Sequence, residues 1–183
     1  MKNYSYILLL VLLLSQCKPK PDNIVTQFAG KPEVPAAIMK EHVYLLDAIG
    51  QLASLPDSTG RAAVKVSELM QHHFNEEESY VLPPLGLLPL LANGQLPEQS
   101  TEVIGLTEKL KTQLNHMSAE HQLIKAFMGE LIVAATRENH PEAMALEMEI
   151  SKHAAMEEEV YFPAAIMVGE YLKLKTGDNH KSP

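Results

Sequence analysis

Two copies of one motif contain the residues of this chain that are best suited to chemistry. His73 is followed by Glu77 and His153 by Glu157, and in both copies a proline comes six residues after the glutamate. Residues four apart lie one above the other on the same face of a helix. Each copy can therefore direct one imidazole and one carboxylate at the same point.

Each copy is preceded by one further histidine. His42 precedes the first copy and His121 the second, and the offset between these two histidines is 79 residues, against 80 for the motifs. Unrelated amphipathic helices are not expected to repeat in such close register. The six residues therefore form one set of two half-sites.

The chemistry predicted for this set is metal binding. All six residues fall on apolar helical stripes, and an ionised carboxylate in a protein core is costly unless it is paired or bound to a metal. Imidazole suits iron, zinc, copper or nickel. We expect two metal ions, one held by His42 and His73, the other by His121 and His153, with both glutamates as bridges. Six protein ligands leave positions open for an oxo or hydroxo bridge and a small exogenous ligand.

Four amphipathic helices are predicted to position these ligands. Their apolar residues recur at helical spacing, and the expected ranges are 35–54, 59–81, 101–137 and 141–175. Pro83 should end the second helix and Pro163 should kink the fourth. The short connections within each pair predict two hairpins, and hence an all-α fold: an up-down-up-down antiparallel four-helix bundle.

Composition and the first residues of the chain restrict its partners and its location. The 183 residues carry a net charge of −8, which argues against a nucleic-acid partner. Residues 1–16 resemble a bacterial export signal, because Lys2 precedes an apolar run that is too short to span a bilayer. Cys17, the only cysteine, follows at the position that is lipidated in bacterial lipoproteins. An ordinary secretory peptide with an incidental cysteine is the alternative.

The domain organisation follows from these observations. We expect a signal peptide, a lipid-anchor cysteine with a polar tether, a four-helix bundle and a disordered tail, over residues 1–16, 17–33, 34–175 and 176–183. Lipidation of Cys17 would anchor the exported protein to the membrane, facing the periplasm or the cell surface. A single cysteine allows no intramolecular disulfide, so stability must come from the core and from bound metal.

The motifs resemble the hemerythrin-like (HHE cation-binding) domain family. That family is built on the order His, His-x-x-x-Glu, His, His-x-x-x-Glu in a four-helix bundle, and the likeness covers roughly residues 34–175. It implies a non-haem di-iron centre, oxo- or hydroxo-bridged, with the ligands His42, His73, Glu77, His121, His153 and Glu157. The spacing alone does not force iron over manganese or zinc.

The chain departs from the oxygen-carrying members of the family at one informative position. Those members place a second histidine one turn before that of the third helix, where this chain has Met117, and His116 is out of phase by one residue. The pattern is nearer the four-His, two-Glu members, which resemble proteins implicated in iron-centre repair and nitric oxide stress. The N-terminal cysteine motif of those cytoplasmic proteins is missing from this sequence.

His72 is the main ambiguity among the ligands, because Glu76 also follows it by four residues. His72 points about 100° away from His73 on a helix, and only Glu77 has the same distance to a proline as Glu157. We therefore assign the ligands to His73 and Glu77. His116 is expected on the helix flank or in a supporting position beside the metals. Three further acidic residues are expected on a solvated face: Glu78, Glu158 and Glu159.

Two functions remain open on the sequence alone. The first is a di-iron protein of the cell envelope that binds or senses O₂, NO or a peroxide. The second is iron storage or delivery, or iron-centre repair under nitrosative or oxidative stress. A ferritin-like oxidase is disfavoured, because no histidine here follows a glutamate by three residues. A ligand-binding protein is thus favoured over an enzyme, and no protein partner is indicated.

Overall fold

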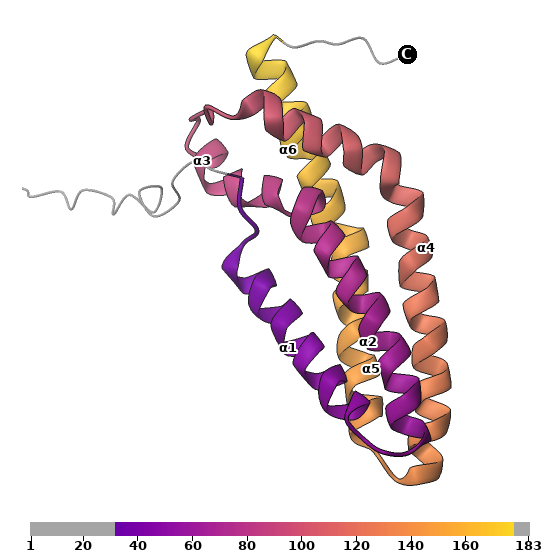
Figure 1. Cartoon of the computed structure of the whole chain (residues 1–183). Coiled ribbons are helices and arrows are strands. Elements are labelled where there is room, and N and C mark those ends of the chain that lie inside the picture. Colours follow the sequence, from indigo (N-terminus) through magenta and orange to yellow (C-terminus); the bar gives the residue numbers. More distant parts are fainter. Residues whose placement is uncertain (1–31, 178–183) are drawn as a thin grey trace, which may run out of the picture.

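The structure, a computed structural model, describes residues 32–177 (Figure 1). Within this range the chain consists of helices and connections, with no β-strand, which confirms the predicted all-α class. The expected signal peptide, Cys17 and residues 178–183 of the expected tail lie outside the described residues.

The first hairpin pairs α1 (Ala36–Ala53) with α2 (Ser58–Glu76). The buried residues of α1 recur three or four positions apart, which is the pattern of a helix with one face in the core: Ile38, His42, Leu45, Ile49 and Leu52. Asp57 ends the turn and begins α2, because its side chain accepts a hydrogen bond from the backbone N–H of Gly60 at 3.1 Å.

The crossover between the hairpins is more helical than the sequence indicated. It contains the π-helical turn η2 (Glu77–Val81), the 3₁₀ segment η3 (Pro83–Leu87) and the short helix α3 (Leu88–Ala92). Leu85 and Leu87 are buried, so this segment closes one end of the bundle. The second helix was predicted to continue to Val81, but its last turn is the π-helical η2.

The second hairpin begins with α4 (Ser100–Glu138), the longest helix of the described chain. It ends at Asn139, whose left-handed conformation (φ 63°, ψ 48°) terminates a helix. The return rod consists of α5 (Glu142–Met156), the π-helical turn η4 (Glu157–Tyr161) and α6 (Phe162–Thr176). The kink expected near Pro163 is thus a π-helical turn that lies directly before α6.

Both π-helical turns begin at the glutamate of the repeated motif. The carbonyl of Glu77 accepts from the backbone N–H of Leu82 at 2.9 Å, five residues on, and that of Glu157 accepts from Phe162. Pro83 and Pro163 follow next, and a proline has no N–H and clashes with the carbonyl four residues before it. The wider turn relieves this clash, which explains why the distance from glutamate to proline is the same in both copies.

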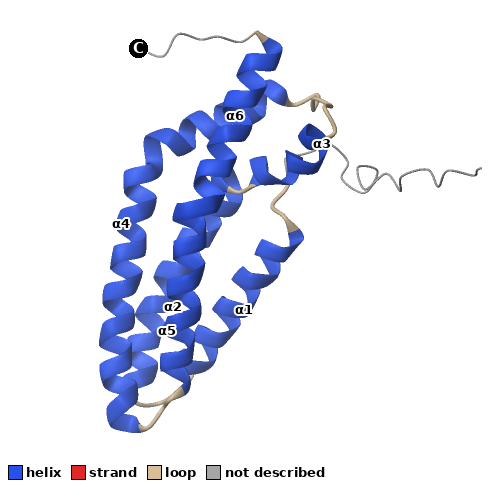
Figure 2. Ribbon diagram, turned by 180° about the vertical axis from the view of Figure 1, so that it is seen from behind, coloured by secondary structure: helices blue, strands red, loops and turns tan. Residues whose placement is uncertain are grey.

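The rods α1, α2, α4 and α5–α6 run alongside one another (Figures 1 and 2). The two hairpin turns meet at one end, and the crossover lies at the other. The buried apolar residues form three clusters. The first is centred on residues such as Leu45, Met70 and Leu131, the second contains Tyr80, Met117 and Phe162, and the third contains residues of the crossover, α4 and α6 such as Leu87 and Leu172. The repeated motifs lie between the first two clusters.

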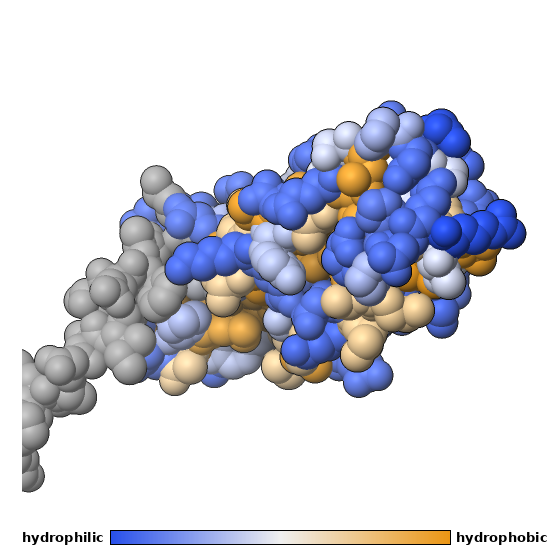
Figure 3. Space-filling view, turned by 90° about the horizontal axis from the view of Figure 1, so that it is seen from below, coloured by the Kyte–Doolittle hydropathy of each residue, from blue (hydrophilic) through white to orange (hydrophobic). Residues whose placement is uncertain are grey.

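The surface is predominantly hydrophilic at the end where the hairpin turns lie, with apolar side chains in smaller areas between polar ones (Figure 3). Among the helices of residues 32–177, none combines the length and apolar composition that a membrane span requires.

Candidate metal centre

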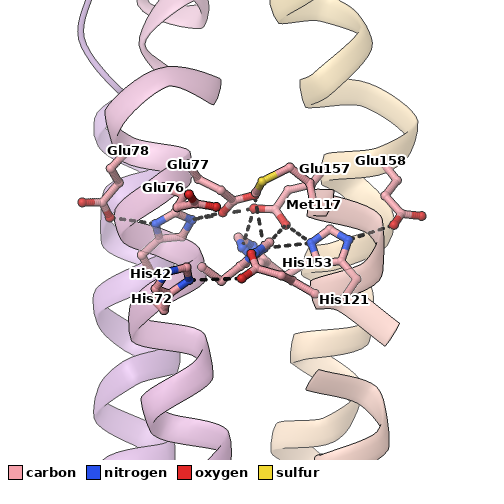
Figure 4. A network of polar contacts seen from close by, with 12 residues as sticks. His42, His72, Glu76, Glu77, Glu78, Met117, His121, His153, Glu157 and Glu158 are labelled. Atoms are coloured by element: carbon pink, nitrogen blue, oxygen red, sulfur yellow. Dashed lines mark hydrogen bonds and ion pairs between the residues drawn. The ribbon is translucent and has the colours of Figure 1, made fainter. Parts of the chain in front are cut away.

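Six side chains converge in the middle of the bundle, and they are the six that the spacing selected. Figure 4 labels all of them except His73. They come from α1, α2, η2, α4, α5 and η4. None of them is more than 7% exposed: His42, His73, Glu77, His121, His153 and Glu157. A buried cluster with this many ionisable groups requires a compensating charge.

The six residues form two groups of four, and both groups contain both glutamates. His42 and His153 belong to one group, and His73 and His121 to the other. In each group, one candidate ligand atom from each of the four residues lies within 4.8 Å of the other three. This grouping differs from the predicted pairing of histidines within each hairpin, because each group takes one histidine from each hairpin. The predicted sharing of both glutamates agrees with this arrangement.

The orientation of α2 explains this pairing. Phe74, the residue after His73, stacks on His42 with ring centroids 3.9 Å apart and planes at 6°. Phe74 thus fills the side of α2 that faces α1, and His73 is turned toward α4. There its Nε2 lies 2.9 Å from Nε2 of His121. The sequence placed both residues on a buried stripe but did not reveal which neighbouring helix each one faces.

Glu157 lies at the centre of the site. Its two carboxylate oxygens are 2.7 Å from Nε2 of His153 and 3.2 Å from Nε2 of His121. The same carboxylate lies 3.8 Å from His42 and 4.0 Å from His73. One side chain therefore reaches all four imidazoles, as a ligand shared by two ions must.

The inward atoms are poorly satisfied by the protein alone. Both oxygens of Glu77, both oxygens of Glu157 and Nε2 of His42 and His153 are buried without a hydrogen-bond partner among the described residues. Buried polar atoms are normally paired, so this concentration of unpaired acceptors at one point points to a cation. Carboxylate and imidazole together are a donor set for first-row transition ions, so these residues fit a two-metal centre.

The electrostatics of the protein residues alone lead to the same conclusion. Burial raises the pKa of Glu77 to about 7, and the neighbouring Glu157 adds to this effect. Burial disfavours the charged forms of Glu157 and His73 as well, but the attraction between the imidazoles and the nearby carboxylates outweighs it. This attraction lowers the pKa of Glu157 well below its usual range and raises the pKa of His73 to about 11. Without a metal, the proton held by His73 supplies positive charge beside the two glutamates.

A ring of four outer glutamates faces the Nδ1 atoms of the histidines. Nδ1 of His42 donates to Glu78 and Nδ1 of His121 donates to Glu158, both at 2.8 Å. Nδ1 of His73 donates to Glu120 at 2.9 Å. Glu41 lies 3.5 Å from Nδ1 of His153. Each histidine is paired with a glutamate from the next rod in chain order, and the last pair closes the ring from α5 to α1.

These outer glutamates do what supports of metal-binding histidines do. A carboxylate on Nδ1 fixes the tautomer and leaves Nε2 for the ion. The sequence interpretation missed this role and expected Glu78 and Glu158 on a solvated face. They are 30% and 40% exposed, so each looks like a surface residue on its own helix. The available signal was the repetition: each single histidine directly follows a glutamate, and the glutamate of each motif is directly followed by another glutamate.

The residues that the sequence left ambiguous lie around this ring. His72 is 61% exposed and donates to Glu120 at 3.1 Å, so it lies outside the centre. His116 is 43% exposed and donates to Glu76 at 2.8 Å. Met117 is fully buried one turn before His121 and accepts a hydrogen bond from the Tyr80 hydroxyl at 3.2 Å.

A cavity of about 200 Å³ reaches the centre from the side of α4 and α5. His73, His121, His153 and Glu157 form its inner wall. Apolar side chains line much of the remainder, among them Met70, Phe74, Ile124, Met128 and Ile150. Polar side chains line it too, among them the exposed Lys125 and the half-buried Glu147. The cavity gives a small molecule access to the inner side of the histidines.

Asp57, Glu138 and His140 form a separate acidic group at the end of the bundle where the two hairpin turns lie. Its oxygen atoms are already engaged. Glu138 accepts from the backbone N–H groups of Ser58 and Thr59 at 3.1 and 2.8 Å, and Asp57 accepts from His140 at 2.9 Å. This group therefore caps α2 and joins the two hairpin turns.

Comparison with known proteins agrees with the geometry of the centre. A sequence model of the hemerythrin HHE cation binding domain matches residues 34–165. Searches of curated proteins and of solved structures gave no match. The match covers most of the chain and contains all six residues of the centre. The chain therefore belongs to the hemerythrin HHE cation-binding domain family.

Proposed function

We propose that this chain is a non-haem di-iron protein of the cell envelope that binds or senses O₂, NO or a peroxide. The observation that carries the proposal is the cavity that leads to the inner side of His73, His121 and His153. A purely structural metal site is closed by its protein ligands, whereas a reactive one keeps a position accessible.

The residues of the centre have separate tasks in this proposal. Glu77 and Glu157 would be shared by both ions, and each ion would be held by the Nε2 atoms of two histidines. The outer glutamates fix the rings through Nδ1. Ferrous iron in such a site would offer an open position and share electron density with a small ligand bound there.

The size and lining of the cavity favour a small, uncharged ligand. Pockets for drug-sized molecules are about 300–1,000 Å³, and this one is about 200 Å³. Its apolar walls do not compensate the charge of a large anion. A neutral diatomic molecule or hydrogen peroxide fits both properties.

The location in the envelope is supported by residues 1–17 alone. The apolar run after Lys2 and the following Cys17 are typical of an exported lipoprotein. In this proposal, lipidated Cys17 tethers the bundle to the membrane surface, and the bundle faces the periplasm or the outside of the cell.

The first test is the metal content of protein from iron-replete cells, measured by mass spectrometry together with its visible spectrum. Two irons per chain and a ferric charge-transfer band are expected.

The second test is stopped-flow binding of NO and O₂ to the reduced protein. Ala154, which lines the cavity beside His153, is changed to Phe to obstruct access. Ala126→Phe, at an exposed position of α4 outside the cavity, is the control.

The expected result is slower ligand binding in Ala154→Phe, at unchanged iron content, with no change in Ala126→Phe. Equal rates in both variants would show that the cavity is not the route. Protein that binds iron but neither gas nor peroxide, and that releases the iron to a chelator on mild reduction, would replace gas binding by iron storage or delivery. Zinc in place of iron in well-folded protein would remove the di-iron proposal.

A further inference from the structure

A second group of histidines and glutamates lies on the outer face of α2 and α4, beside the buried centre. His72 and Glu76 belong to α2, and His116 and Glu120 to α4. Figure 4 labels His72 and Glu76 next to the residues of the buried centre. These residues are partly open to solvent: His72 is 61%, His116 43% and Glu76 31% exposed.

The atoms of this group are spaced as ligands of one cation. Candidate ligand atoms of His72, Glu76 and Glu120 lie within 4.8 Å of one another. Nε2 of His116 adds a fourth, 2.8 Å from a carboxylate oxygen of Glu76 and 3.7 Å from Oε1 of Glu120. Tetrahedral ligands at about 2.0–2.2 Å from an ion are roughly 3.3–3.6 Å apart, so small side-chain shifts suffice.

The internal repeat provides a comparison within the same molecule. The buried centre and its outer glutamates occur in both halves, but this group occurs in only one half. Glu41, the counterpart of Glu120, is the only member that the other half retains. At the three remaining positions it has residues unsuited to a shared cation: Ala37, Lys152 and Met156. The group is therefore not a by-product of the duplication that built the buried centre.

We propose that His72, Glu76, His116 and Glu120 form a second cation site, which takes a divalent first-row transition ion from solvent. Two imidazoles and two carboxylates suit Zn²⁺ or Fe²⁺. The exposure of the site makes it accessible without opening the bundle. The ion would replace the present contacts between the histidines and the glutamates.

Glu120 connects this outer site to the buried centre. Its Oε1 lies 3.1 Å from His72, and its Oε2 lies 2.9 Å from Nδ1 of His73. A cation on Oε1 withdraws charge from the carboxylate that supports a ligand of the buried centre, and such supports tune the bound metal. Occupancy of the outer site is therefore communicated to the buried centre.

The binding site is tested with Zn²⁺ as the probe. The protein is first loaded with its resident metal, excess metal is removed, and Zn²⁺ is titrated by isothermal calorimetry. The wild type is expected to bind one further Zn²⁺ ion. The His72→Ala/His116→Ala variant is expected to bind it at least about tenfold more weakly, since even groups that only support a metal ligand contribute this much.

His140→Ala is the matched control, because His140 is another histidine in contact with two acidic side chains, at the far end of the bundle. It should bind Zn²⁺ as the wild type does. No further ion in the wild type, equal affinity in the double variant, or loss of the ion in His140→Ala would each overturn the proposal. An unchanged amount of resident metal in the double variant shows that its fold is intact.

The connection through Glu120 rests on the proposed function, because its readout is the visible band of the buried iron. Addition of Zn²⁺ to the loaded wild type is expected to shift this band, with no shift in the double variant. A band that Zn²⁺ leaves unchanged would overturn the connection. The absence of any iron band would instead contradict the proposed function. It would not affect the calorimetric test of the outer site, which does not depend on iron.

Discussion

The Nε2 atoms of His73 and His121 lie 2.9 Å apart, although the two residues belong to different hairpins. Their ring centroids are 4.6 Å apart, and those of His42 and His153 are 5.1 Å apart. The two halves of the centre are therefore built across the hairpins. Neither hairpin alone contains a complete half-site.

This pairing predicts how double variants lose metal. His73→Ala/His121→Ala removes both histidines of one half, so we expect it to retain about one of the two proposed ions, whereas His42→Ala/His121→Ala damages both halves and should retain almost none. Metal per chain is measured by mass spectrometry, with circular dichroism as the check on folding. If the His42→Ala/His73→Ala variant retained an ion instead, the pairing within hairpins would be correct.

Metal binding should release protons, and the affinity should fall as the pH is lowered. In the metal-free protein the pKa of His73 is raised to about 11 and that of Glu77 to about 7, so at pH 6 both hold protons that a metal ion must displace. Each displaced proton lowers the affinity by about tenfold per pH unit. Calorimetry in buffers of different ionisation enthalpy counts these protons. An affinity that is constant between pH 6 and 8 would contradict the prediction.

The sequence predicted the components of this centre better than their arrangement. The six residues could be selected from the period of a helix alone, because Glu77 follows His73 by four residues and the same spacing recurs at His153. The structure places these six residues together. The pairing depends on how α2 is rotated relative to its neighbours. Phe74 decides this by stacking on His42, and a periodic pattern in one helix does not contain that contact.

The outer glutamates show the same limit. Glu158 is 40% exposed and looks like a solvated residue until α4 is packed beside it, where it accepts a hydrogen bond from His121. The π-helical turns could also have been predicted from the sequence, since the distance from Glu77 to Pro83 recurs in the second copy. Proline was interpreted only as the end or kink of a helix, although the backbone can also widen before it.

Glu158 allows a prediction with a neighbouring control. Glu158→Gln keeps the shape of the side chain but removes the carboxylate that faces Nδ1 of His121. We expect metal affinity to fall by about 10- to 100-fold, which is the usual effect of losing such a support. Glu159→Gln, an exposed position in the same turn, should have little effect. Competition with a chelator of known affinity measures both variants, and equal affinities would exclude the supporting role of Glu158.

Gly169 controls how closely α6 approaches α4. A Cβ at this position would collide with the side chain of Thr107, which is fully buried. Gly169→Ala should therefore destabilise the bundle by about 1–3 kcal/mol, as overpacking of a core does. Gly129→Ala, in α4, meets open space and should stabilise by about 0.5–1 kcal/mol, because alanine is the better helix former. Urea unfolding of the metal-free variants measures both, and a neutral Gly169→Ala would show that the helices can separate.

Glu138 should make the stability of the end with the two hairpin turns depend on pH. Its carboxylate accepts hydrogen bonds from the hydroxyl and backbone N–H groups of Ser58 and Thr59 at the start of α2. These contacts lower the pKa of Glu138 to about 2, from 4.5. A lowered pKa means that the folded protein favours the charged form. The stabilisation is therefore fully present above pH 4.5 and is lost as the pH falls toward 2.

The matching experiment compares Glu138→Gln with Glu130→Gln in thermal unfolding of metal-free protein between pH 2 and 7. Glu130 also lies on α4 and is exposed, with its carboxylate on Lys65, so it controls for the loss of one negative charge. Glu138→Gln should melt below the wild type at pH 7, and the difference should shrink steadily as the pH falls below 4.5, because protonation removes the same charge from the wild type. Glu130→Gln should follow the wild type throughout. A difference for Glu138→Gln that stayed constant down to pH 2 would mean that the amide destabilises the protein through its hydrogen-bond geometry. The charge of Glu138 would then contribute nothing to joining the two hairpin turns.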